Sequence, residues 1–504
     1  MEDQNIGKTS GPEPTPSKPD KSVNMDSTKG SKESTNESTT SLQDQPPFTI
    51  YTHREKVVLM LILSFIGFWS TFSSPIYFPA LPTISEEFHL TSSVTDLSVV
   101  AYLVFQGIAP TFSGNFADTL GRRPVIMASM LIFIAANIAI SQTNVYWLLT
   151  FLRCVQAIGI APTIAISLGV SGDICTAADR GGFVGTVSGL QLTGNAFGGL
   201  VGAALISGFG WRGIFVFLAI GSGVTLIIIS FILPETVRTI VGNGSVPAKS
   251  FLNYSPIFLL NHYKKRLTND VSTLSPKKKL DLLAPFKILV HKETICVLFP
   301  AGIQFASWTM VLTSLTLLEG DGYNYSVLKV GFIYLPQGVT CFIGSILTGK
   351  CLDMMYRYRK NQHDLKYHDV KHKPKFNALK ARIIVSIPPI IMSFVGLVIF
   401  GWCLQFKKNI SSIIISTCLV SFSSTALISI CTTIIVDLHP SKGSTSASLM
   451  NLVRCLLAAL GTGVLSKMTK AMGLGGCYTF WAAMGLFSDS LLLVVLILKR
   501  KEHK

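Results

Sequence analysis

Arg153 and Asp489 are charged side chains inside long apolar runs, where a charge is costly and is therefore expected to have a function. Arg153 is in the middle of one run, in Arg153-Cys-Val-Gln156-Ala-Ile-Gly159, and Asp489 is in the last run. An ionised side chain at the centre of a membrane-spanning helix costs about 2.5–3.5 kcal/mol on insertion scales, so each should face other helices or a water-filled cavity. A guanidinium stays charged at physiological pH. Asp489 is thus a candidate proton carrier or a carboxylate facing water near a helix end, and Arg153 is a candidate for acting on a carboxylate or for joining helices.

Six other polar or aromatic residues lie within or beside apolar runs. Such side chains either line a cavity that binds a small molecule or make hydrogen bonds and packing contacts between helices. Both interpretations stay open from the sequence alone. These candidate pocket residues are Gln106, Gln191, Asn195, Trp308, Tyr334 and Asn451.

A charged loop follows the second apolar run and has the sequence Gly114-Asn-Phe-Ala-Asp118-Thr-Leu-Gly121-Arg122-Arg123. We expect Gly114 to let neighbouring helices approach closely, because it has no side chain. Asp118 is a carboxylate at a helix end, where it can pair with a guanidinium or cap the N-terminus of another helix. The sequence therefore predicts that this loop controls a conformational change, and the alternative is an ordinary polar turn.

The loop has a partial repeat in the second part of the chain, Gly349-Lys-Cys-Leu-Asp353, which follows the eighth apolar run. Two further carboxylates, Asp173 and Asp437, close the fourth and tenth runs. These acids are either members of gate-forming ion pairs or solvated helix ends.

The elements that must position these residues are apolar runs of about 20 residues, the length of helix that crosses a ~30 Å hydrocarbon core. The chain is 49% hydrophobic and 14% charged, with a mean hydropathy of +0.48, whereas a soluble domain carries about 25% charged residues. Backbone groups inside lipid must bond to one another, and these runs are too long for barrel strands, so they must be helices. The expected spans are 57–78, 92–113, 124–141, 146–170, 182–206, 212–233, 294–318, 327–348, 382–402, 410–436, 444–466 and 476–498.

These spans predict an all-α membrane protein with twelve transmembrane helices in two six-helix halves. The first segment is rich in Ser, Thr, Pro, Asp and Lys and has too few apolar residues to fold. The expected organisation is a disordered cytoplasmic tail (1–50), the N-terminal half (51–236), a cytoplasmic central loop (237–292), the C-terminal half (293–498) and a short cytoplasmic tail (499–504).

Basic residues are distributed unequally between the two sides of this arrangement. The side that holds both termini carries 35 of the 43 Lys and Arg residues, the other side carries six, and Arg153 and Arg454 lie within spans. Because cytoplasmic loops are enriched in Lys and Arg, both termini should be cytoplasmic. The same distribution explains the net charge of +16 without a nucleic-acid partner.

The Gly114–Arg123 loop is similar to the signature loop of the major facilitator superfamily. Other motifs resemble the fungal twelve-span drug:proton antiporters of that superfamily, in particular the quinidine-resistance and short-chain monocarboxylate-resistance exporters of yeasts. They include Pro75-Ile-Tyr-Phe-Pro79-Ala-Leu-Pro82, Trp211-Arg212-Gly-Ile-Phe215, Leu233-Pro-Glu-Thr236-Val-Arg238 and Asn451-Leu-Val-Arg454-Cys455.

The resemblance runs from about residue 52 to the C-terminus and implies two further roles. Arg153 matches the span-4 arginine that this family associates with proton coupling. The glycine-rich fifth span resembles the antiporter motif but has Gly194-Asn195 in place of Gly-Pro. That difference removes a kink and makes Asn195 a candidate pocket residue.

The expected function is a proton-coupled exporter of amphiphilic drugs or small organic acids that works by alternating access as a monomer in the plasma membrane. A vacuolar or prospore membrane is the alternative location. The rival functions are a dedicated exporter of one metabolite (an amino acid, polyamine or spore-wall precursor) and a non-transporting sensor. The sequence contains no enzyme motif, phosphate-binding loop or spaced metal-ligand set, so neither catalysis, nor a cofactor, nor a metal site is expected.

Overall fold

The computed structural model describes residues 48–175, 177–248, 250–259, 265–268, 274, 276, 284–319, 323, 325–367, 378–438 and 443–502. Regular secondary structure within these residues is entirely helical, which confirms the predicted all-α fold. The predicted disorder of the N-terminal tail concerns residues that lie outside this description, apart from 48–50.

The N-terminal half contains the helices that precede the central loop. Its first helix starts with a capping box, in which the Thr52 side chain accepts a bond from Glu55 N and the Glu55 carboxylate accepts one from Thr52 N at 2.7 Å. Its elements are α2 (His53–Phe72), the 3₁₀ helix η1 (Pro75–Ala80), α3 (Leu81–Glu87), α4 (Ser92–Thr95), α5 (Leu97–Leu120), α6 (Arg122–Gln142), α7 (Tyr146–Ile160), α8 (Pro162–Ile174) and α9 (Ala177–Ile232).

The connecting segment and the C-terminal half follow the same plan. Short helices occupy the described parts of the connection, and long apolar helices come after it. Its elements are α10 (Arg238–Val241), η2 (Pro256–Leu259), α12 (Ala284–Leu289), α13 (Lys292–Ser314), η4 (Leu315–Glu319), α14 (Val327–Lys366), α15 (Ala378–Gln405), α16 (Ile410–Leu438) and α17 (Gly443–Glu502).

Ten helical segments of the described chain are long and apolar enough to cross a membrane, and two of them are double. The segments Thr193–Ile232 and Ser446–Val495 have 40 and 50 residues, so each would be about 60 Å or more in length as one straight helix. Each is interrupted by a glycine with positive φ, Gly210 (φ 70°) and Gly473 (φ 73°), a conformation open to glycine at no steric cost. Counting each double segment as two gives the predicted twelve spans.

Several predicted boundaries differ from the observed ones, and α14 in particular runs to Lys366 rather than ending near residue 348. The first span was expected as one helix over 57–78, but the α-helix ends at Phe72 and a 3₁₀ turn starts at Pro75. The prolines there remove backbone donors that an α-helix requires. A loop was expected over 467–475, but α17 stays helical up to the break at Gly473, because a helix that leaves the hydrocarbon core can keep lysines on its surface.

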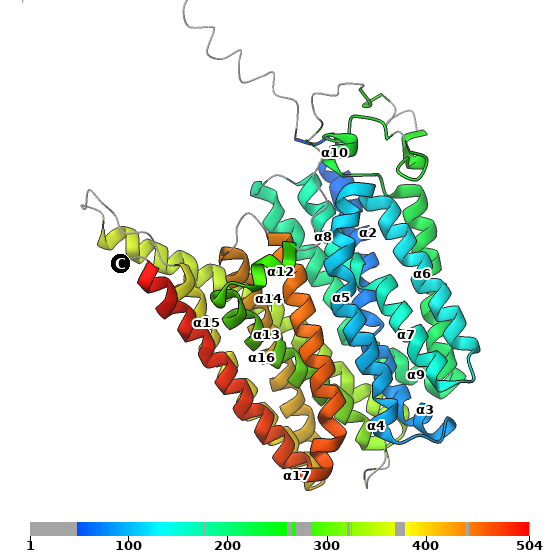
Figure 1. The fold of residues 1–504 in the computed structure, drawn as a ribbon, viewed down its shortest axis with the longest axis vertical. Helices are drawn as coiled ribbons and strands as arrows, with labels where there is room; N and C mark the ends of the chain where they lie inside the picture. The colour runs from blue at the N-terminus through cyan, green and yellow to red at the C-terminus, as the bar shows by residue number, and fades with distance from the viewer. Residues whose placement is uncertain are drawn as a thin grey trace, which may run out of the picture. The chain divides into compact units, whose positions relative to one another are not determined.

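The two halves contact each other through α5 with α17 and α9 with α14. We call the end of the bundle that carries α3, α4 and η4 the turn end, and the end that carries α10 and α12 the loop end. Close contacts start at the turn end, where Ser93 Oγ and Ser466 Oγ are 2.6 Å apart, and reach the middle of the bundle, where Gly107 lies against Cys455. Figure 1 shows the helices of the two halves separating toward the loop end.

Candidate functional site

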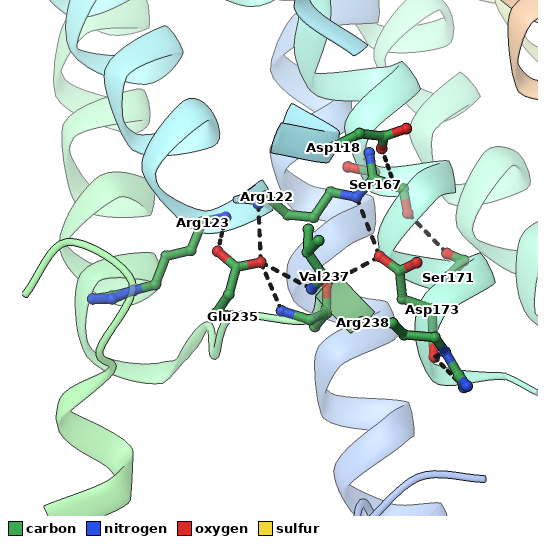
Figure 2. A network of polar contacts seen from close by, with 10 residues as sticks. Asp118, Arg122, Arg123, Ser167, Ser171, Asp173, Glu235, Val237 and Arg238 are labelled. Atoms are coloured by element: carbon green, nitrogen blue, oxygen red, sulfur yellow. Dashed lines mark hydrogen bonds and ion pairs between the residues drawn. The ribbon is translucent and has the colours of Figure 1, made fainter. Parts of the chain in front are cut away.

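A network of ion pairs lies at the loop end of the N-terminal half. The Arg122 guanidinium is 2.6 Å from Asp118 Oδ1 and 3.2 Å from Asp173 Oδ2. Figure 2 shows Arg122 reaching from the start of α6 to both acids. The structure thus joins two residues of the Gly114–Arg123 loop to Asp173, which the sequence placed at the end of the fourth run.

Glu235 is the centre of this network, and the sequence prediction did not include it. Its side chain is 1% exposed, and its carboxylate accepts bonds from the backbone N–H groups of Arg122 (2.9 Å) and Arg123 (3.1 Å). It also accepts bonds from Thr236 N and Val237 N, at 2.8 and 3.0 Å. Glu235 therefore caps the N-terminus of α6, where a negative charge is stabilised by the helix dipole (Figure 2).

Gly121 and Arg123 fit around this carboxylate. Gly121 has φ 115°, and a Cβ atom there would lie 2.4 Å from Glu235 Oε2, so a side chain would displace the cap. Arg123 is 4% exposed and donates to the carbonyl oxygens of Tyr254 (3.0 Å) and Ser230 (2.5 Å). Arg123 is therefore a structural link between α6, α9 and the start of the central loop.

The C-terminal half repeats part of this network. Arg382, near the start of α15, donates from Nε to Asp437 Oδ2 at 2.8 Å, as Arg122 does to Asp173. Asp353 is exposed and forms no ion pair among the residues that the structure describes. The expectation that Gly114 permits a close helix approach is wrong for this arrangement, because a Cβ at Gly114 would meet no atom within 4 Å. Gly114 lies near the loop end, where the two halves are separated, so no neighbouring helix comes close to it.

Arg153 is enclosed in the N-terminal half. Its side chain is 1% exposed, and its guanidinium carbon lies 4.0 Å from the ring centre of Tyr77 and 4.2 Å from that of Tyr102. Its Nη1 donates to Gln156 Oε1 at 2.5 Å, and Gln156 donates in turn to Asn137. No carboxylate contacts Arg153 within the described part of the chain, so neither Asp173 nor Asp489 lies beside it.

The charge of Arg153 is thus compensated by rings and an amide. A desolvated cation–π contact is worth about 2 kcal/mol, and a hydrogen bond to a charged group about 1.5–3 kcal/mol. Together these exceed the roughly 3 kcal/mol that a mid-membrane arginine costs. Because Tyr77 is in η1 and Tyr102 is in α5, the enclosure joins three elements of the half.

Asp489 lies in the other half, in the last span of α17. It is 3% exposed; its Oδ2 accepts from Gln304 Nε2 at 2.9 Å, whereas its Oδ1 is buried with no partner. Gln304 Oε1 accepts from Ser393 at 2.8 Å. The carboxyl therefore has one oxygen fixed by an amide and one that could carry a proton without breaking a hydrogen bond.

Gln106 and Asn451 meet where α5 crosses α17. Asn451 Nδ2 donates to the backbone carbonyl oxygen of Gln106 at 3.0 Å, and Asn451 Oδ1 accepts from Arg454 Nη2 at 2.7 Å. The Arg454 guanidinium also lies 4.5 Å from the Phe305 ring centre. Arg454 was noted in the sequence but not predicted as a site residue, although a second arginine inside a span was the available signal.

The remaining predicted pocket residues are mostly packed. Gln191 is 2% exposed and donates to the Leu63 carbonyl oxygen at 3.2 Å. Trp308 donates to Gln337 and Ser421, and Tyr334 donates to the Leu312 carbonyl oxygen at 2.8 Å. Asn195 is half-buried. In this arrangement, three of these four side chains make bonds between helices, and their role as pocket residues stays a prediction.

The fold defines a class of protein: a multi-pass membrane transporter built from two helical halves that meet at one end and separate at the other. The Major Facilitator Superfamily model matches residues 59–462, and the chain belongs to this superfamily.

Relatives and solved structures agree with this assignment. The chain is 58% identical over 461 residues to the "MFS antiporter QDR1" of Candida albicans, covering 91% of each chain. It is 39% identical over 483 residues to "Quinidine resistance protein 1" of Saccharomyces cerevisiae, covering 91% of this chain and 86% of the relative. A solved D-xylose-proton symporter is 14% identical, covers 88% of this chain and 97% of its own, and has a TM-score of 0.64, so it shows the fold alone.

Proposed function

We propose that this protein exports amphiphilic drugs in exchange for protons, by alternating access. Small organic acids are the second substrate class, and a dedicated metabolite exporter is the alternative function. The names of the curated relatives support antiport and drug resistance. The observation that carries the proposal is Asp489, a 3% exposed carboxyl group with one oxygen free of partners. Such a group inside a membrane protein is a functional site by default.

The ion-pair network provides the gating step of this proposal. All of its described members belong to the N-terminal half in this arrangement, with Asp118 bound to Arg122. Closing the loop end would bring the C-terminal half against Asp118 and offer it another partner. Arg122, Asp173, Asp353 and Asp437 would then shift their pairing between the two states, as two-state transport requires.

The proposed orientation places the loop end in the cytoplasm of a fungal cell, with the protein in the plasma membrane. The support is the excess of Lys and Arg on that side. In a cysteine-free background, a single cysteine at Leu365, which is 77% exposed, should resist a membrane-impermeant maleimide on intact cells. One at Lys407, exposed near the turn end, should react. The opposite labelling pattern would reverse the orientation.

Transport is tested in proteoliposomes that contain the purified full-length chain. An imposed pH gradient should drive movement of a fluorescent drug against its concentration gradient, and a protonophore should stop it. Asp489→Asn should keep downhill exchange and lose accumulation, because an amide does not release a proton. Accumulation that is equal with and without the pH gradient would rule out proton coupling.

A further inference from the structure

A cavity of about 620 Å³ lies at the turn end, between the two halves. Its walls come from both halves: α3 and α4 on one side, and the end of α13, η4, the start of α14 and the middle of α17 on the other. Drug-sized ligands occupy cavities of about 300–1,000 Å³. The apolar part of the wall includes Leu81, Leu317, Val327 and Leu465.

Three carboxylates line this cavity, and none of them makes a side-chain hydrogen bond or ion pair with another described residue. Asp96 is only 9% exposed, and its carboxylate makes no hydrogen bond or ion pair within the described residues. Glu319 is half-buried, and its Oε1 is fully buried without a hydrogen-bond partner. Glu86 is the third acid and is exposed. A buried carboxyl group is either protonated or compensated by a cation or hydrogen-bond donor. The described residues supply no such partner to Asp96 or Glu319, so their ionised forms would be stabilised by a cation in the cavity.

The only basic residue on the described cavity wall is Lys470. It is exposed and forms no ion pair with any of the three acids. Neighbouring acids outside the cavity are different, because Glu87 is bound to Arg212 at 2.7 Å and to the Trp211 indole. The cavity therefore has an excess of two negative charges when its acids are ionised.

We propose that this cavity binds the cationic group of an organic substrate, an ammonium or onium centre attached to an apolar body. The inference rests on the proposed export function and narrows its substrates to organic cations at this site. Asp96 and Glu319 come from opposite halves, so a cation between them would attract both. The apolar wall residues would contact the body of the ligand. The site lies at the turn end, on the far side of the bundle from the ion-pair network.

The test uses two ions of matched size and shape, the tetraphenylphosphonium cation and the tetraphenylborate anion. Equilibrium binding to the full-length protein in lipid nanodiscs is measured without a pH gradient and at constant ionic strength. Asp96→Asn and Glu319→Gln keep the side-chain shape and remove the charge, and together they should weaken tetraphenylphosphonium binding by about tenfold. The matched control is Asp364→Asn, which removes one charge from an exposed position on α14.

Weaker binding of the cation with unchanged or tighter binding of the anion would support the site. Equal loss of both ions would indicate a general structural defect and overturn the proposal, as would unchanged cation binding in the double variant or equal loss in Asp364→Asn. Because no gradient is applied, the result is independent of proton coupling. A protein that binds the cation through Asp96 and Glu319 but shows no gradient-driven transport would refute the proposed antiport and leave the site intact.

Discussion

Replacing Arg153 with alanine should abolish drug efflux driven by a pH gradient, with a fall of at least about tenfold, while the protein still reaches the membrane. The substitution removes the cation between the Tyr77 and Tyr102 rings and leaves Gln156 without its charged donor. One hydrogen bond to a charged group is worth about 1.5–3 kcal/mol, and tenfold corresponds to 1.4 kcal/mol. Gradient-driven efflux from proteoliposomes measures the effect.

Arg153→Lys is the matched variant for this prediction. An ammonium keeps the charge but cannot reproduce the planar guanidinium that stacks on two rings, so efflux should return only in part. Asn137→Ala removes the amide behind Gln156 and leaves the cation in place, so it should retain most of the activity. If Arg153→Ala responds to the gradient as strongly as the parent protein, this arginine is structural and does not couple protons to substrate.

Replacing Glu235 with glutamine should destabilise the protein by about 3 kcal/mol and lower its thermal unfolding temperature in detergent. The carboxylate accepts four backbone N–H bonds, and an amide would direct its own N–H groups at some of them. The loss combines hydrogen bonds to a charged group with the helix-dipole term of α6. The same change leaves the buried Arg123 without a neighbouring carboxylate.

The variant Asp118→Asn, in the same network, tests the gating role without a large expected change in stability. The Asp118 side chain is about 29% exposed and pairs with Arg122 across the turn between α5 and α6, and partly exposed ion pairs contribute about 0–1 kcal/mol. Its unfolding temperature should stay close to the parent value, while the transport rate falls with similar relative preferences among substrates. Selective loss of one substrate would contradict a gating role, and an unchanged unfolding temperature in Glu235→Gln would contradict the cap.

The spans could be predicted from the sequence because lipid imposes a fixed length and composition on a crossing helix. The ends of spans were less predictable. Nothing in composition shows that Pro75 and Pro79 convert the end of the first span to a 3₁₀ turn, or that α17 extends past its apolar part with Lys467 and Lys470 on its surface. Helix ends depend on local caps and on neighbouring elements rather than on hydrophobicity.

The part of the site that is formed by residues close together in the sequence could also be predicted. Asp118 and Arg122 are four residues apart on either side of Gly121, so the short turn between α5 and α6 keeps them close together. Glu235 is 112 residues from Arg123 along the chain, and its motif indicated only a family resemblance. The rings around Arg153 come from two other elements, and one sequence does not state which helices are neighbours. The sequence predicted that Arg153 needs a partner, but not that two tyrosines and a glutamine provide it.

The glycine breaks at Gly210 and Gly473 have a practical consequence for handling this protein. Each joins two spans through a single non-helical residue, and side chains from neighbouring helices hold both turns. Glu87 binds Arg212 beside the first, and Gln405 accepts a bond from Gly475 N at 2.6 Å beside the second. An inserted epitope or fluorescent protein would therefore disrupt these turns, and a protease would not find an extended loop to cleave there. Tags and binding sites for antibody fragments should instead be placed at the loop end, on the exposed C-terminal part of α14.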